Sequence, residues 1–565
     1  MAGKIEELPP PALRQGYTDA FEHLVDELLR VRLLLQRLVI RKQERGELSG
    51  GGLSVARGEI ACFFARPPGA GETEAAGPMA APGGEQAAAL SPALLDGLLG
   101  EVRQRIDERL AATGQLGRFR PPLLGLERRF ALKPEEMDIV RVLLAPEIDP
   151  RFERAYCYCW NDFTRKRPTI GFVLELLADD LRGMEAYRDL LLASGTLRHC
   201  GLVLLPAESA GSQESFLARS VLLSPRIVDF LRGRDEPDES IRRYARHIVP
   251  ELQLDRLVLP EAVRRAALEA AGAALDCWAG RAAVQDGQAC PAAARKKAAR
   301  ALHLWGRPHA GKRSLVLAVA AATGRPVWQV DLGTLFAELE QREDQLWAVL
   351  REARLSDAVT LLDASADVPA DGVPWRTAAL LAEAIRAIPG PVFVCAPHRL
   401  GWLLHACPAL REQPLPMPTA DEREKVLVQT LSRLGPCEAD LDLPDLASRF
   451  GLTGGALVRA AHLAREMADE RADEGELRRA DLLAACQKEL SHRLASLAEQ
   501  LSSTFGWDDV VLPEATLSRL KELLAYARNR RFILESWGFR HILPYGGGLT
   551  VLFTGPPGTG KTMVA

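Results

Sequence analysis

Apolar residues in the first part of the chain follow the spacing of an α-helix. Between residues 18 and 45 they recur at alternating steps of three and four, at Phe21, Leu24, Leu28, Val31, Leu35 and Leu38. This pattern predicts an amphipathic helix. The helix either pairs with a second protomer as a short coiled coil or packs on its own domain. The glycine run at residues 50–52 ends the pattern.

The following stretch lacks the apolar residues that a core needs. Residues 66–91 are rich in Ala, Gly, Pro and Glu and carry almost no large apolar side chain. Such a segment cannot bury enough surface to offset the entropy of ordering. We therefore expect residues 65–92 to form a disordered linker between an N-terminal helical segment at residues 1–64 and a second domain at residues 93–241.

Helical periodicity returns after this segment. Two apolar stripes are formed by Leu94, Leu95, Leu98, Leu99, Val102 and Ile106, and by Met137, Val140, Leu143 and Leu144. The sequence Lys133-Pro134-Glu135-Glu136 is typical of a helix start. Apolar segments at residues 200–205 and 220–223 predict two short strands. Helices followed by a small hairpin indicate a winged-helix-like adaptor.

A basic run at residues 165–168 raises nucleic-acid binding as an alternative. It lies close to four aromatic residues, Tyr156, Tyr158, Trp160 and Phe163. Basic and aromatic residues together can hold nucleic acid. Acidic neighbours at Asp149, Glu153 and Asp162 dilute the charge, so a solvated helix end beside an aromatic core explains the segment as well.

The last residues of the chain contain a phosphate-binding pattern. An apolar run at residues 549–553 predicts a strand, and the motif G-x-x-x-x-G-K-[ST] follows it as Gly555, Pro556, Pro557, Gly558, Thr559, Gly560, Lys561 and Thr562. Glycines allow backbone N–H groups to approach phosphate oxygens, and the following helix N-terminus attracts anions. Lys561 is expected to bind the β- and γ-phosphates and Thr562 to bind Mg²⁺. The ligands predicted are ATP and Mg²⁺.

The sequence given ends at Ala565, three residues after Thr562. Hydrolysis of ATP also needs an acidic strand end, a polar sensor and an arginine that acts on the γ-phosphate. These groups are not present after the loop. We expect the chain to be a fragment of a longer protein.

Two segments of the chain recur at nearly equal spacing. Residues 255–262, DRLVLPEA, return as residues 508–515, DDVVLPEA, with their prolines 253 positions apart. The loop that begins at Gly306 and ends at Lys312 matches the later loop, and the two lysines are 249 positions apart. The sequence therefore predicts one complete module, with a large subdomain at residues 242–417 and a helical lid at residues 418–500, and the start of a second at residues 501–565.

The first module has lost parts of the expected chemistry. Its loop keeps Gly306, Gly311 and Lys312, but Arg313 stands where the Mg²⁺-binding Ser or Thr belongs. The predicted strand at residues 358–364 keeps Asp363 as a Mg²⁺ ligand and has Ala364 in place of a second carboxylate. The strand at residues 391–396 ends without a polar sensor. We expect no hydrolysis at this module. Two alternatives remain for its loop: it binds nucleotide through Lys312 and the backbone, or it is a relic that holds no nucleotide.

Composition narrows the setting of the protein. A net charge of −4 over 565 residues gives no global basic field for nucleic acid. The ten cysteines show no metal-ligand spacing and no disulfide framework. No signal peptide and no apolar run long enough for a bilayer are present. These features indicate a cytoplasmic protein that does not contact membranes.

The motifs resemble those of the AAA family of ATPases, in the tandem arrangement of the valosin-containing-protein type. The resemblance runs from about residue 245 to the end and is carried by GPPGTGKT at residues 555–562, by the entry at residues 504–510 and by FGLTGGAL at residues 450–457. The adaptor, with LERRF at residues 126–130, LAPE at 144–147 and NDFTRKRP at 161–168, is similar to the winged-helix domain of bacterial members. Some of those members are encoded with phage-tail-like contractile injection systems.

The resemblance implies an α/β fold, a hexameric ring completed by an arginine from each neighbour, and ATP turnover that remodels a protein client. It also implies that Lys561 holds phosphate, Thr562 binds Mg²⁺ and Asp363 is the Mg²⁺-side aspartate. Arg313, Ala364 and Cys395 depart from the family pattern. The leading hypothesis is an ATP hydrolase that remodels a protein complex, such as a contractile apparatus. The alternatives are a non-catalytic nucleotide-binding scaffold and, last, a nucleic-acid unwinding enzyme.

Overall fold

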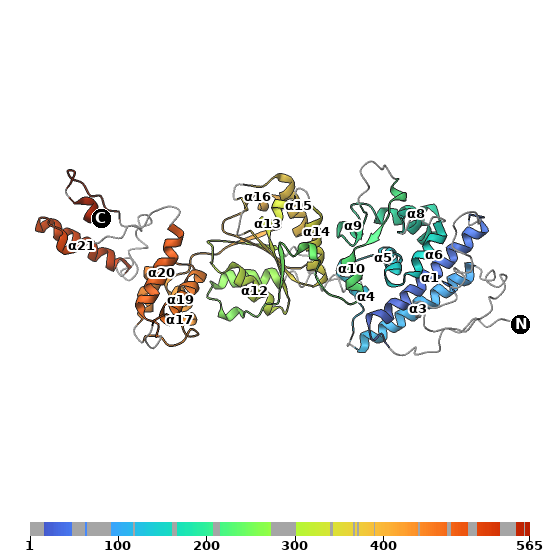
Figure 1. The fold of residues 1–565 in the computed structure, drawn as a ribbon, viewed down its shortest axis with the longest axis horizontal. Helices are drawn as coiled ribbons and strands as arrows, with labels where there is room; N and C mark the ends of the chain where they lie inside the picture. The colour runs from blue at the N-terminus through green and yellow to red at the C-terminus, as the bar shows by residue number, and fades with distance from the viewer. Residues whose placement is uncertain are drawn as a thin grey trace. The chain divides into compact units, whose positions relative to one another are not determined.

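The computed structural model describes residues 16–47, 63–64, 92–116, 119–160, 167–206, 215–272, 301–339, 343–364, 368–369, 372–388, 390–438, 441–471, 476–494, 506–531, 550–558 and 560–564. The chain divides into two compact units. One contains Met1–Leu254, Ala262–Trp305 and Arg313–Pro414, and the other contains Asp255–Glu261, Gly306–Lys312 and Leu415–Ala565. The fold is α/β, with a helical N-terminal region followed by a mostly parallel sheet (Figure 1).

The N-terminal region is built from helices around one core. They are α1 (Ala20–Glu44), α3 (Pro92–Leu116), α4 (Pro122–Phe130), α5 (Pro134–Ile148), α6 (Arg151–Trp160), α7 (Ile170–Leu177), α8 (Leu181–Leu190), α9 (Thr196–His199) and α10 (Pro225–Leu231). Helix α5 begins at the expected proline, where the backbone N–H of Lys133 donates to Glu136 at 2.8 Å. This contact satisfies a donor that the helix itself leaves unpaired.

Helix α1 packs on its own domain, as one of the two readings of its periodicity predicts. The side chain of Asp19, the residue before the helix, accepts a hydrogen bond from the N–H of Glu22 at 2.8 Å and caps the helix start. The apolar stripe from Leu24 to Leu38 is buried in the core that also contains residues of α5, α6 and α7, and α1 lies alongside α3 (Figure 1). Helix α1, which lies in the segment expected at residues 1–64, thus supplies part of the core of the helices within residues 93–241. The linker expected at residues 65–92 lies outside the described residues except for Pro92.

The predicted hairpin is present at the end of this region. Strand β1 (Val203–Leu204) pairs antiparallel with β2 (Leu222–Leu223). The aromatic residues near the basic run face inward, since Tyr156 and Tyr158 are buried in the core. Side chains committed to a core cannot stack on bases, which weakens the nucleic-acid reading. Arg165 and Lys166 of the basic run lie outside the described residues.

A six-stranded sheet follows, in the order β3-β5-β6-β7-β4-β8. Its strands are β3 (Ala245–Ile248), β4 (Ala301–Trp305), β5 (Val327–Asp331), β6 (Val359–Asp363), β7 (Val392–Ala396) and β8 (Arg411–Pro414). All neighbours are parallel except β3 and β5. Strands β6 and β7 are buried throughout, which explains their nearly continuous apolar sequences. Strand β4 lies between β7 and β8, so the carboxyl ends of β4, β6 and β7 meet at one edge.

The sheet is flanked by helices that belong to the same unit. They are α12 (Lys312–Ala322), α13 (Leu332–Leu339), α14 (Glu343–Leu355), α15 (Trp375–Ala387) and α16 (Gly401–Ala406). Apolar residues from the strands and from α13, α14 and α15 form one buried cluster. A further helix at residues 261–272 precedes β4 in the chain.

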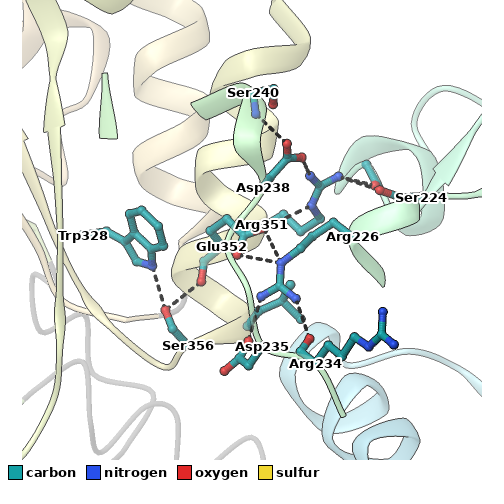
Figure 2. A network of polar contacts seen from close by, with 12 residues as sticks. Ser224, Arg226, Arg234, Asp235, Asp238, Ser240, Trp328, Arg351, Glu352 and Ser356 are labelled. Atoms are coloured by element: carbon teal, nitrogen blue, oxygen red, sulfur yellow. Dashed lines mark hydrogen bonds and ion pairs between the residues drawn. The ribbon is translucent and has the colours of Figure 1, made fainter. Parts of the chain in front are cut away.

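Buried ion pairs dock the N-terminal region on α14 (Figure 2). Arg226 of α10 donates through Nε to both carboxylate oxygens of Glu352, at 2.9 and 3.0 Å, and the Glu352 side chain is 1% exposed. The neighbouring Arg351 donates to the carbonyl of Gly201 at 2.8 Å and pairs with Asp238. Breaking one partner of such a buried pair leaves an uncompensated charge. The winged-helix-like region and the sheet are thus joined by specific contacts.

The second unit contains the helical lid. Its helices are α17 (Ala420–Leu431), α18 (Leu443–Arg449), α19 (Gly454–Asp469) and α20 (Arg479–Leu494). Helix α17 begins with a capping box, in which Thr419 and Glu422 exchange hydrogen bonds of 2.8 and 3.2 Å. Alanines of α19 and leucines of α17, α18 and α20 share a core. The described part of residues 418–500 contains these helices and an isolated bridge between Cys437 and Leu477.

The last described elements are α21 (Glu514–Arg531) and α23 (Lys561–Val564). The strand predicted before Gly555 is not formed by residues 550–554, which pair with no other strand among the described residues. In the first module the matching strand β4 is held by β7 and β8, whereas the described residues from 506 onward provide no such neighbours. No described helix has the length and apolar character that crossing a bilayer requires.

Candidate functional site

The first loop, Gly306–Lys312, connects β4 to α12 and has three residues with positive φ. These are Gly306 at +153°, His309 at +60° and Gly311 at +95°. At Gly306 a Cβ atom would lie 2.6 Å from the carbonyl oxygen of Leu415, so a side chain is excluded. The ammonium of Lys312 donates to the carbonyls of Gly306 and Arg307 at 2.6 and 2.9 Å. The lysine is therefore folded back over the concave side of its own loop.

The second loop, Gly555–Lys561, has the same backbone shape. Positive φ angles occur at Gly555 (+155°), Gly558 (+80°) and Gly560 (+78°), at the three positions that match those of the first loop. Lys561 donates to the carbonyls of Gly555 and Pro556 at 2.9 and 2.5 Å. Pro556, Pro557 and Gly558 are exposed. Thr559 and the side chain of Thr562 lie outside the described residues. The internal repeat thus extends from sequence to loop conformation.

The lid touches the first loop directly. The hydroxyl of Thr453 donates to the carbonyl of Pro308 at 3.3 Å, and the N–H of Gly455 donates to the carbonyl of His309 at 2.9 Å. A Cβ at Gly455 would lie 2.8 Å from that carbonyl oxygen, so only glycine allows this approach. The sequence placed both residues in the lid, but nothing in it showed that they contact the loop.

The two strand ends expected to carry chemistry lie side by side. Asp363 of β6 is in register with Cys395 of β7, and the N–H of Ala364 donates to the carbonyl of Cys395 at 2.8 Å. Ala364 and Cys395 are both buried. The structure therefore brings together the two positions at which the sequence lacks a second carboxylate and a polar sensor. Neither of these buried side chains can activate or orient a water molecule as a carboxylate and an amide would.

Asp363 is paired with the residue that follows the loop lysine. The guanidinium of Arg313 forms an ion pair with Oδ2 of Asp363, and Gln329 donates to the same oxygen at 3.1 Å. The Asp363 side chain is 3% exposed. The sequence predicted Asp363 as a Mg²⁺ ligand; the structure shows it bound by a cation of the chain itself.

His303, which sequence reasoning missed, fastens the strand before the first loop. Its Nδ1 donates to the carbonyl of Val394 at 3.2 Å, and its Nε2 accepts from the N–H of Leu400 at 3.1 Å. These partners require a neutral ring. Burial lowers the pKa of His303 below its ordinary value. A polar residue inside the apolar run ALHLW was the available signal.

The two loops differ in how they fit ATP and Mg²⁺. Both offer a glycine-shaped backbone and a lysine, which suit phosphate oxygens. The first loop is followed by Arg313, whose cation does not suit a divalent metal, while the second is followed in sequence by Thr562, whose hydroxyl does.

Comparison with known proteins supports the N-terminal assignment. Residues 6–245 match the family described as "Winged helix domain, variant". A chain of the solved structure "Structural Basis for Katanin Self-Assembly" is 18% identical, covers 44% of this chain and 89% of its own, and has a TM-score of 0.31. That likeness is too distant to carry a functional conclusion. No curated protein matches the chain.

Proposed function

We propose that the protein is an ATP-binding ATPase of the AAA type that couples hydrolysis at its second loop to the remodelling or assembly of a protein complex. The observation that carries this proposal is the pair of matching loops, each with three positive-φ positions and a lysine folded over its carbonyls. Phosphate groups can displace these carbonyls as partners of the lysine, since an anion is the stronger acceptor.

The two modules have different parts in this proposal. The second loop, with Lys561 and Thr562, binds ATP and Mg²⁺ and supports turnover. The first loop holds nucleotide without hydrolysing it, because Ala364 and Cys395 supply neither base nor sensor. A hexameric ring and a protein client, such as a component of a contractile injection system, follow from the family resemblance. The buried docking of the winged-helix region on α14 supports an adaptor that moves with the first module.

The test is ATP turnover by the full-length gene product and two lysine variants. Lys561→Ala is expected to lower kcat at least about 100-fold, because a phosphate-binding cation at the transition state contributes several kcal/mol. Lys312→Ala is expected to change kcat less than about threefold. Turnover that survives Lys561→Ala and is lost in Lys312→Ala would reverse the assignment of the active module.

A second candidate is a non-catalytic scaffold whose assembly depends on nucleotide. The ion pair between Arg313 and Asp363 favours it, because it removes catalysis from the one complete module. This candidate predicts no turnover together with a nucleotide-dependent change in sedimentation coefficient. A sedimentation coefficient that is the same with ATP, with ADP and without nucleotide would exclude the scaffold candidate.

A further inference from the structure

The ion pair between Arg313 and Asp363 joins the first turn of α12 to the end of β6. Asp363 is almost fully buried, while the Arg313 side chain is 53% exposed. The same carboxylate oxygen also accepts from Gln329 at 3.1 Å. A buried carboxylate needs a compensating cation, and here the chain supplies it. About half of the Arg313 side chain therefore stays accessible to solvent and to a second anion.

These residues do not fit a divalent metal. At an intact loop, Mg²⁺ takes oxygen ligands from the hydroxyl after the lysine and from the acidic strand end. In the first module the hydroxyl is replaced by a guanidinium, which has no lone pair to give, and the carboxylate already holds that cation. A divalent ion placed there would be repelled by Arg313 at close range.

We propose that the first loop binds the phosphates of a nucleotide without a divalent cation, with Arg313 supplying positive charge that Mg²⁺ supplies at an intact loop. This inference rests on the proposed nucleotide binding by the loop. The two cations of Lys312 and Arg313 against the single anion of Asp363 leave a net positive charge. That charge favours the metal-free polyphosphate, which is more anionic than its magnesium complex.

The experiment measures binding of a fluorescent ATP analogue to the full chain carrying Lys561→Ala, so that the first loop is observed alone. Anisotropy titrations are made in excess Mg²⁺ and in excess EDTA. The expected Kd values agree within about threefold, or are lower in EDTA. A Kd at least about tenfold higher in EDTA would overturn the proposal, and so would absence of binding in both buffers.

Two matched variants in the same background separate the metal position from general charge. Arg313→Thr restores a hydroxyl and removes the cation paired with Asp363, so nucleotide binding is expected to become at least about tenfold tighter in Mg²⁺ than in EDTA. Arg307→Thr removes the same charge from an exposed loop residue and is expected to weaken binding equally in both buffers. Equal metal dependence in the two variants would refute a special role for Arg313.

Failure of this proposal is distinguishable from failure of the proposed function. Turnover at Lys561 is measured on the unmodified chain, whereas the metal dependence is a binding measurement made without that lysine. Metal-dependent binding at the first loop together with Lys561-dependent turnover would reject only the inference about Arg313.

Discussion

The two glycine-rich loops, Gly306–Lys312 and Gly555–Lys561, have the same backbone and lysine geometry but differ in their contacts and in their motif residues. The first follows a strand paired on both sides and is contacted by the lid through Thr453 and Gly455, yet Arg313 and Ala364 replace its chemistry. The second keeps the complete motif, yet the residues before it, 551–554, pair with no described strand, and Leu552 is 84% exposed. Among the described residues, the lid contact and the complete motif are therefore found at different loops.

The comparison shows which part of a phosphate loop is encoded locally. Matching φ angles arise at matching positions whether or not the preceding strand is paired, because glycines and short-range carbonyl contacts to the lysine are sufficient to define the turn. Pairing of the strand, closure by a lid and neutralisation of Asp363 all depend on residues far along the chain.

The largest effect is expected for Gly306→Ala. A new Cβ would meet the carbonyl of Leu415 at 2.6 Å on a backbone that favours glycine, so we expect a loss of about 3 kcal/mol in local stability. Hydrogen exchange of the loop peptides measures it. Gly558→Ala, at a positive-φ position of the second loop where a Cβ meets no atom within 4 Å, is the comparison change and is expected to cost about 1 kcal/mol. Equal costs would show that tertiary contact adds nothing at the first loop.

Loss of the contact between the lid and the first loop is expected to destabilise the protein less than Gly306→Ala does. Gly455→Ala would place a Cβ 2.8 Å from the carbonyl of His309, and we expect about 2 kcal/mol of destabilisation as the lid withdraws from the loop. Urea unfolding of the lid, followed by hydrogen exchange of α19, gives the value. The neighbouring Gly454→Ala has no atom closer than 3.9 Å and should be neutral or slightly stabilising. Similar losses in both variants would contradict the contact.

The pH dependence of the first module is expected to depend on His303. Its folded pKa is lowered from 6.5, so the unfolded chain binds the proton more readily. Stability is then present above pH 6.5 and is lost as the pH falls toward the folded pKa, by at most about 1.4 kcal/mol for each pH unit. Urea midpoints between pH 5 and 8 should show this slope.

His303→Gln should flatten that slope, because the titrating ring is removed. Replacement of the exposed His405 by Gln should leave it unchanged. An unaltered slope in His303→Gln would assign the pH dependence to other groups.

The smallest effect is expected at the fourth loop position. His309 has φ +60° where the second loop has Gly558. His309→Gly relieves a left-handed residue but increases the entropy of the unfolded chain, so the net change should stay below about 1 kcal/mol. Thermal unfolding of the two proteins is the measurement. A larger loss would mean that contacts of the imidazole itself maintain the first loop.

Several features could be predicted from the sequence because they depend on neighbours in the chain. Glycine positions and the lysine determine the conformation of both loops, and Pro134 with Glu136 starts α5. Continuous apolar runs predicted β6 and β7, since strands buried on both faces need no polar alternation. The winged-helix character of the N-terminal region was predicted in the same way and agrees with the family match.

Only the tertiary structure decided which of these elements meet. Residues 551–554 have a strand-like sequence but no described partner, because a parallel strand is stable only beside others. Helix α1 packs in the core of the N-terminal region, because its apolar stripe has buried neighbours within the chain. The pairing of Arg313 with Asp363 joins residues 50 positions apart, and periodicity and motif spacing carry no information on such contacts.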